Sequence, residues 1–145
     1  MKIRPASEPA GDGVRLHPVS PKARGWGHEP DTRAAIEWLE EHVKSGVTVC
    51  DIGTGTGILA LVAAKLGAVV TAYESDPDVR EVAKRNITLN RAKVKLLGEY
   101  DGADGFDLVV ANLGSKVDYD PLGSKVDYAG MGILEAGKEV WTTNG

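Results

Sequence analysis

The chain has 145 residues, of which 42% are apolar and 26% are charged, and its formal net charge is −4. This length fits one domain, and the apolar fraction is too high for a disordered chain. No apolar stretch approaches the roughly 20 residues that span a bilayer, and residues 1–11 lack the pattern of a signal or transit peptide. We therefore expect a globular, cytoplasmic domain without membrane contact.

The charged residues and the single cysteine exclude further classes. The 17 Lys and Arg residues are scattered along the chain rather than gathered in a stripe, which gives no strong signal for nucleic acid. Cys50 can form no internal disulfide, and no cysteine or histidine lies near it at metal-ligand spacing, so no metal site is predicted. The expected partners are small molecules or proteins.

The N-terminal part differs in composition from the rest, so residues 1–24 are interpreted as an arm and residues 25–145 as the domain. The segment up to Gly27 holds four of the seven prolines and no sustained apolar period, so little regular structure is expected there. A helix is then predicted from a cap at Asp31 or Thr32 up to Gly46, because apolar residues recur at helical spacing.

Strands and helices alternate along the remaining sequence. Short β-branched runs predict buried parallel strands, and the segments between the first three have helical periods. Alternation of this kind favours a doubly wound, Rossmann-like α/β fold, here with five parallel strands in the order 3-2-1-4-5. The predicted strands are 47–50, 68–73, 93–97, 106–111 and 138–143, and the predicted helices between them are 58–66 and 77–89, the second capped by Asp76.

A seven-residue segment, Leu-Gly-Ser-Lys-Val-Asp-Tyr, occurs twice, at 113–119 and 122–128. Two short copies are too few and too small for a repeat architecture. A duplicated loop or short helix is the favoured interpretation, and two copies of one contact are the alternative.

The pattern with chemical meaning is Asp-x-Gly-x-Gly-x-Gly at 51–57, directly after the first strand of the sheet. Glycines at a strand-to-helix turn let a ligand approach the main chain beside the positive helix N-terminus. The dinucleotide fingerprint G-x-G-x-x-G fails when it is counted from Gly53. Its relaxed form fits only from Gly55, later than that fingerprint requires, so a dinucleotide site stays a minor alternative.

This pattern resembles motif I of the class I S-adenosylmethionine (SAM) methyltransferases. Later residues follow the order of that family: Glu74 after the second strand implies bonds to ribose hydroxyls, a Gly-Glu-Tyr stretch after the third implies an adenine contact, and Asn112 stands at motif IV. The resemblance implies a SAM site that comprises Asp51, Gly53, Thr54, Gly55, Gly57, Glu74, Ser75, Glu99, Tyr100, Asn112 and Thr32.

Within this superfamily, the stretches 25–33 (Gly-Trp-Gly-His-Glu-Pro-Asp-Thr-Arg) and 109–113 (Val-Val-Ala-Asn-Leu) look like the bacterial ribosomal-protein lysine methyltransferases. The sequence Glu-Ser-Asp-Pro at 74–77 fits the acidic-x-Asp-Pro pattern of the same family. The resemblance covers about 25–112 and implies that the first stretch closes over SAM. It does not cover the family's separate N-terminal domain, which recruits the ribosomal protein, so the substrate is not carried over.

The leading hypothesis is SAM-dependent transfer of a methyl group to a nitrogen of a protein or small-molecule acceptor. Such a transfer depends mainly on aligning the nucleophile and excluding water. Asn112 would orient the acceptor amine, and His28, Glu29 or solvent would take the proton of a lysine acceptor. The alternatives are a non-catalytic or partner-dependent SAM-binding subunit, and an enzyme that cleaves SAM without a methyl acceptor.

The fifth predicted strand is the last element of the sequence, whereas the full methyltransferase fold has seven strands. A strand edge with unpaired backbone groups promotes aggregation unless it is covered. We therefore expect a homo-oligomer, a partner chain or a terminal segment to cover this edge.

Overall fold

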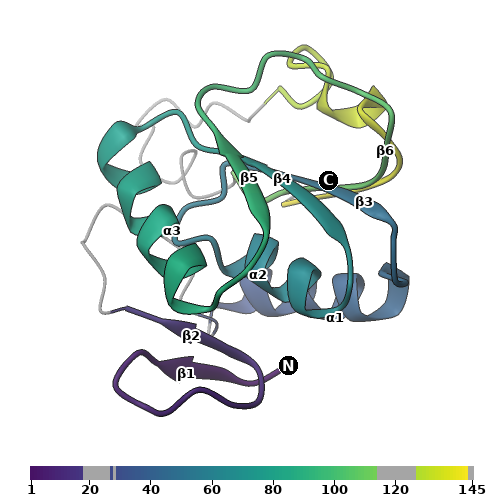
Figure 1. Cartoon of the computed structure of the whole chain (residues 1–145). Helices are drawn as coiled ribbons and strands as arrows, with labels where there is room; N and C mark the ends of the chain where they lie inside the picture. Colours follow the sequence, from purple (N-terminus) through teal and green to yellow (C-terminus); the bar gives the residue numbers. More distant parts are fainter. Residues whose placement is uncertain (18–26, 28, 114–126, 144–145) are drawn as a thin grey trace.

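The computed structural model describes residues 1–17, 27, 29–113 and 127–143. Five strands in this part form one parallel sheet (Figure 1). The sheet order is β5-β4-β3-β6-β7, which confirms the predicted order 3-2-1-4-5 and the α/β fold class. The strands are Thr48–Ile52 (β3), Val69–Tyr73 (β4), Val94–Leu97 (β5), Phe106–Ala111 (β6) and Gly137–Thr142 (β7).

Three α-helices and a short 3-10 helix accompany the sheet in the described residues, at Pro30–His42 (α1), Ile58–Lys65 (α2), Pro77–Leu89 (α3) and Ile133–Glu135 (η1). The start of α3 is as predicted, because the Asp76 carboxylate accepts from the amides of Asp78 at 2.9 Å and Val79 at 3.4 Å. No helix in the described ranges is long and apolar enough to cross a membrane.

Two boundaries differ from the predictions. Helix α1 is capped by Glu29 rather than Asp31 or Thr32, because Pro30 takes the first helical position, where its missing amide leaves no bond unmade. The same helix ends at His42, well before Gly46. Strand β3 continues through Ile52, since both neighbouring strands keep pairing with it there, so Asp51 lies inside the strand rather than beyond its end.

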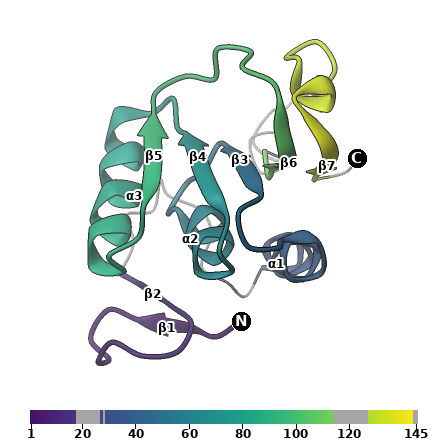
Figure 2. The ribbon, with the colours of Figure 1, turned by 45° about the vertical axis from the view of Figure 1, so that its right-hand side comes forward.

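The sheet separates two apolar cores, because successive side chains of a strand point to opposite faces. Val49 and its same-face neighbours pack with α1 and α2 in the larger core. Cys50 and Ile52 pack on the other face, where Leu113 and Ile133 cover them. In Figure 2 the helices α1 and α2 lie together on one side of the strands.

The expectation of little regular structure near the N-terminus is wrong for its described part. Ile3–Pro5 (β1) and Val14–Leu16 (β2) form a two-stranded parallel sheet, here called the arm sheet. Val14 is 1% exposed and belongs to the larger core. Strands of three residues are too short to show a period in the sequence. The predicted boundary between residues 24 and 25 lies outside the described residues and stays a prediction.

Candidate functional site

The glycine loop, residues 53–57, joins β3 to α2 at the carboxyl edge of the sheet. Gly53, Gly55 and Gly57 have φ angles of 74°, 60° and 88°, a backbone region that side chains other than glycine disfavour. A Cβ atom at Gly53 would also collide with the side chain of Leu113. The loop therefore needs its glycines for conformation and for space.

Strand β4 holds the glycine loop in place through its last residues. The amides of Gly53 and Thr54 both donate to the Tyr73 carbonyl at 2.9 Å. The Glu74 carboxylate accepts from the Gly55 amide at 3.0 Å and from the Asp76 amide at 3.1 Å. Glu74 therefore lies where the sequence predicts an acidic ligand-binding residue, and its carboxylate still has acceptor capacity for ribose hydroxyls.

Asp51 lies beneath the glycine loop and is 1% exposed. Its Oδ2 accepts from the Thr54 hydroxyl at 2.6 Å, whereas Oδ1 accepts no hydrogen bond of normal geometry from the described residues. Burial raises the pKa of this carboxyl from 3.8 to about 7, against the lowering effect of the Thr54 hydroxyl. One buried acceptor atom is thus left beside the loop for a donor group.

Asn112 and Thr32 come together although 80 residues separate them. The Asn112 Nδ2 donates to the Thr32 hydroxyl at 3.4 Å, and its Oδ1 accepts from the hydroxyl of Thr143. Thr143 escaped the sequence analysis because nothing in its local sequence marks it. Its place is set by pairing, since β6 and β7 are parallel and end at the same edge of the sheet.

The positions of the residues that follow β4 and β5 say less about a ligand. Ser75 and Glu99 are exposed. The Tyr100 ring meets Tyr73 edge to face at a centroid distance of 5.2 Å, and its hydroxyl donates to the Ala103 carbonyl at 2.7 Å. These contacts fix the loop after β5 near the carboxyl edge, while the adenine contact stays a prediction.

Two other sequence candidates have different outcomes. His28 lies outside the described residues, so its role as a proton acceptor stays a prediction. Next to it, the buried Gly27 donates its amide to the Glu29 carboxylate at 3.2 Å. Cys50 is fully buried, as expected of a small apolar residue, and burial raises the pKa of its thiol, which keeps it unreactive.

Asn86 is a residue that the sequence analysis missed. Its side chain is 0% exposed, its Nδ2 donates to the Thr56 carbonyl at 2.8 Å, and its Oδ1 accepts from the His17 amide at 2.8 Å. One turn later, the Asn90 side chain bonds both the amide and the carbonyl of Arg15. Helix α3 thus joins the glycine loop to the arm sheet. The available signal was a polar residue on the face that Val79 and Ala83 bury.

The comparisons with known proteins agree with this geometry. Residues 14–117 match the family model described as ribosomal protein L11 methyltransferase (PrmA). The chain belongs to this family. Members of the L11 methyltransferase family are SAM-dependent enzymes. This membership favours SAM over the dinucleotide alternative.

Individual relatives point the same way. The chain is 48% identical over 93 residues to a ribosomal protein L11 methyltransferase of Burkholderia mallei and 42% identical over 107 residues to that of Ralstonia pickettii. These matches cover 63% and 72% of this chain, but only 31% and 36% of the relatives. The chain thus spans about a third of the length of these relatives.

A solved structure of a ribosomal protein L11 methylase from Lactobacillus delbrueckii subsp. bulgaricus superposes with a TM-score of 0.66 at 33% identity, covering 77% of this chain and 61% of that chain. A 16S rRNA N2 G1207 methyltransferase of T. thermophilus, solved with AdoMet and guanosine, gives a TM-score of 0.52 at 28% identity. Its match covers 58% of this chain and 25% of that one.

The described residues of this L11 methyltransferase family member fit a SAM ligand. Three glycines with positive φ keep the loop free of side chains, so a ligand can lie against the main chain. Asp51 Oδ1 is a buried acceptor without a normal partner, and Glu74 stands at the end of the neighbouring strand. A polar, adenosine-containing cation suits such acceptors and such a loop.

Proposed function

We propose that this chain binds SAM against the glycine loop and takes part in methyl transfer to a nitrogen of ribosomal protein L11. The observation that supports SAM binding is the glycine loop itself, which is held between Asp51 and Glu74 near the carboxyl ends of β3 and β4. The names of the relatives support the acceptor. Because the chain spans a third of those relatives, activity and acceptor are proposals for it.

In this proposal each residue near the loop has a defined task. The glycine loop supplies main-chain contacts, Glu74 accepts the ribose hydroxyls, and Asp51 offers its buried Oδ1 to a donor group. Ser75, Glu99 and Tyr100 are assigned to the adenosine end. When bound, SAM supplies an electrophilic methyl group on a sulfonium.

On the acceptor side, Asn112 is assigned to orient the amine and Thr32 to hold the Asn112 amide. The amide is already fixed from both ends, by Thr32 at Nδ2 and by Thr143 at Oδ1. A fixed amide lowers the entropic cost of aligning a nucleophile, which is the main requirement of this reaction. His28 is assigned to accept the proton that a lysine acceptor has to lose.

Glu74→Gln is expected to weaken SAM binding by about 10- to 100-fold, the range for losing hydrogen bonds to a charged group. Glutamine keeps the shape of the side chain but replaces one acceptor by an NH₂ group, which would face the Gly55 or Asp76 amide. The measurement is a calorimetric titration of the purified chain with SAM, with S-adenosylhomocysteine and NAD as comparisons.

The matched control is Glu81→Gln, which changes an exposed carboxylate of α3 and should leave SAM affinity unchanged. Equal affinities of Glu74→Gln and the wild type would remove Glu74 from the site. If the folded wild-type chain bound NAD more tightly than SAM, the cofactor assignment itself would be wrong.

The acceptor is tested by incubating the chain with SAM and ribosomal protein L11. Methylated lysine or N-terminal amine in L11, together with S-adenosylhomocysteine, would support the enzyme. Activity that appears only after another chain is added would favour a partner-dependent SAM-binding subunit. Homoserine lactone or methylthioadenosine would instead identify cleavage of SAM without transfer.

We further infer a cytoplasmic protein in which another chain or segment covers the outer edge of β7. Among the described residues, β7 pairs with β6 alone, so its other edge offers main-chain groups for pairing. Sedimentation would test this inference. A monomer whose β7 amides exchange freely with solvent would contradict it.

A further inference from the structure

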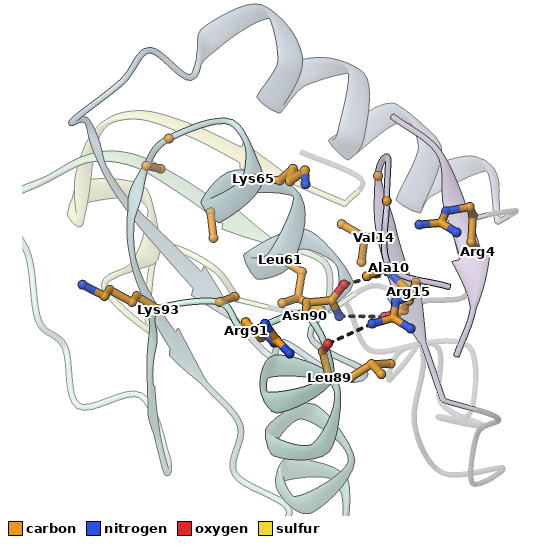
Figure 3. Close-up of a pocket in the computed structure, with 16 residues that line it drawn as sticks. Arg4, Ala10, Val14, Arg15, Leu61, Lys65, Leu89, Asn90, Arg91 and Lys93 are labelled. Carbon is orange, nitrogen blue, oxygen red and sulfur yellow. Dashed lines mark hydrogen bonds between the residues drawn. The ribbon is translucent and has the colours of Figure 1, made fainter. Parts of the chain in front are cut away.

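A cavity lies away from the glycine loop, between the arm sheet and the C-terminal ends of α2 and α3 (Figure 3). Its lining includes residues just before β4 and β5, so it lies at the amino edge of the sheet, whereas the glycine loop lies at the carboxyl edge. The volume of about 730 Å³ falls within the range of small-molecule sites.

The cavity is strongly basic although the chain as a whole is acidic. Five cations line it, and no Asp or Glu does so in the part of the chain that the structure describes. In Figure 3, Lys93 lies on the side opposite Arg4 and Arg15, with Arg91 between them, and the Lys93 side chain points away from the other labelled cations. The five are Arg4, Arg15, Lys65, Arg91 and Lys93. Apolar side chains, among them those of Val14, Leu61 and Leu89, form the rest of the lining.

Three of these cations have a structural explanation. Arg4 donates to the carbonyls of Asp12 and Pro9 and lies 3.7 Å from the Glu8 carboxylate. Arg15 donates to the Leu89 carbonyl at the end of α3. Lys65 stands in the last turn of α2, where a cation offsets the negative end of the helix dipole.

Arg91 and Lys93 have no such explanation. The structure shows no ion pair or side-chain hydrogen bond of either within its described residues. Arg91 is also the one described residue other than glycine with a positive φ, at 51°. It takes the position after a helix end where glycine is the usual residue, so its backbone is strained. Its exposed side chain has no charged partner among the residues that the structure describes. A bound anion would supply the missing partner.

We propose that this cavity binds a small phosphorylated molecule with an apolar body, its phosphate groups held by Arg91 and Lys93. Several guanidinium and ammonium groups among the lining residues suit an anion with more than one charge, and the guanidinium fork suits phosphate oxygens. The apolar part of the lining suits the body of such a ligand. An extended nucleic acid fits less well, because the chain is acidic overall and these cations line one cavity rather than a long stripe.

The test is calorimetry of the full chain with inorganic triphosphate and with naphthyl phosphate. We expect one binding site for triphosphate, with an affinity that falls as salt increases. Naphthyl phosphate should bind at least about tenfold more tightly than inorganic phosphate, because its rings can bury apolar surface in the cavity.

The variants are Arg91→Gly and Lys93→Gln, and each should weaken triphosphate binding by at least about fivefold. Glycine removes the charge while relieving the positive φ, so Arg91→Gly should unfold at the same temperature as the wild type or higher. Loss of binding together with retained stability cannot come from misfolding. Lys44→Gln, an exposed lysine outside the cavity, is the control and should bind triphosphate as the wild type does.

Several outcomes would overturn the proposal. The first is that triphosphate does not bind, and the second is that Lys44→Gln weakens its binding as much as Arg91→Gly and Lys93→Gln do. The third is that citrate binds as tightly as triphosphate. The fourth is that an RNA oligonucleotide binds more tightly than triphosphate, in a way that depends on Arg91 and Lys93. SAM affinity should be unchanged in all three variants, because the two sites lie at opposite edges of the sheet. The proposal for the cavity and the proposal for the SAM site can therefore be refuted independently.

Discussion

The wild-type chain is expected to lose stability as the pH rises from about 4 to about 7, and Asp51→Asn is expected to abolish this pH dependence. The cause is burial, which raises the pKa of Asp51 from 3.8 to about 7 in the folded chain. In the unfolded chain the carboxyl ionises near its ordinary pKa, while in the folded chain it keeps its proton until about pH 7.

Between these two pH values the unfolded state binds fewer protons than the folded state. The free energy of unfolding therefore falls as the pH rises through this window, and the loss is complete above the folded pKa. A shift of about 3 pH units corresponds to about 4 kcal/mol, so the effect is large for a domain of this size.

The measurement is urea unfolding at about pH 5 and about pH 8 for the wild type and the variant. Asparagine keeps an oxygen for the Thr54 hydroxyl but cannot ionise, so the stability of Asp51→Asn should depend less on pH by a few kcal/mol. Asp104→Asn, which changes an exposed carboxylate, should keep the wild-type pH dependence. The same pH dependence in Asp51→Asn and the wild type would show that Asp51 has an ordinary pKa.

Asn86→Ala is expected to lower the free energy of unfolding by about 2–4 kcal/mol. The substitution removes the buried hydrogen bonds of the Asn86 side chain to the Thr56 carbonyl and the His17 amide, and it also leaves a void. Because one side chain holds both groups, the arm sheet and the glycine loop should loosen together. Urea unfolding measures the first effect, and hydrogen exchange of the residue 14–17 and 53–57 amides measures the second.

Two further variants separate the bonds from the volume. Asn86→Asp keeps the acceptor for His17 but lacks the donor for Thr56, so it should disturb the glycine loop more than the arm sheet. Thr88→Ala, at an exposed position on the same helix, should stay within about 0.5 kcal/mol of the wild type. If Asn86→Ala were as stable as Thr88→Ala, the buried bonds would contribute nothing measurable.

The fold was largely predictable because its signals are local. Short apolar or β-branched runs predicted all five strands of the main sheet, and the capping residue before α3 together with the proline at its first position predicted its start. The end of α1 was less predictable, since Val43 continues the apolar period but already has an extended backbone. The arm sheet left no periodic signal, because each of its strands has three residues and β2 is placed by contacts with α2 and α3, far away in the sequence.

The sequence by itself determined the order of the elements and the glycine loop, because chain reversals at positive φ need glycine wherever the rest of the protein lies. It also determined that Glu74 follows the end of the neighbouring strand, beside that loop. Only the tertiary structure decided the partners across the chain: Thr143 with Asn112, and Asn86 with both Thr56 and His17. The same holds for the basic cavity. Its five cations are scattered in sequence and look like ordinary surface charges there, and only the packing of the arm sheet against α2 and α3 brings them around one space.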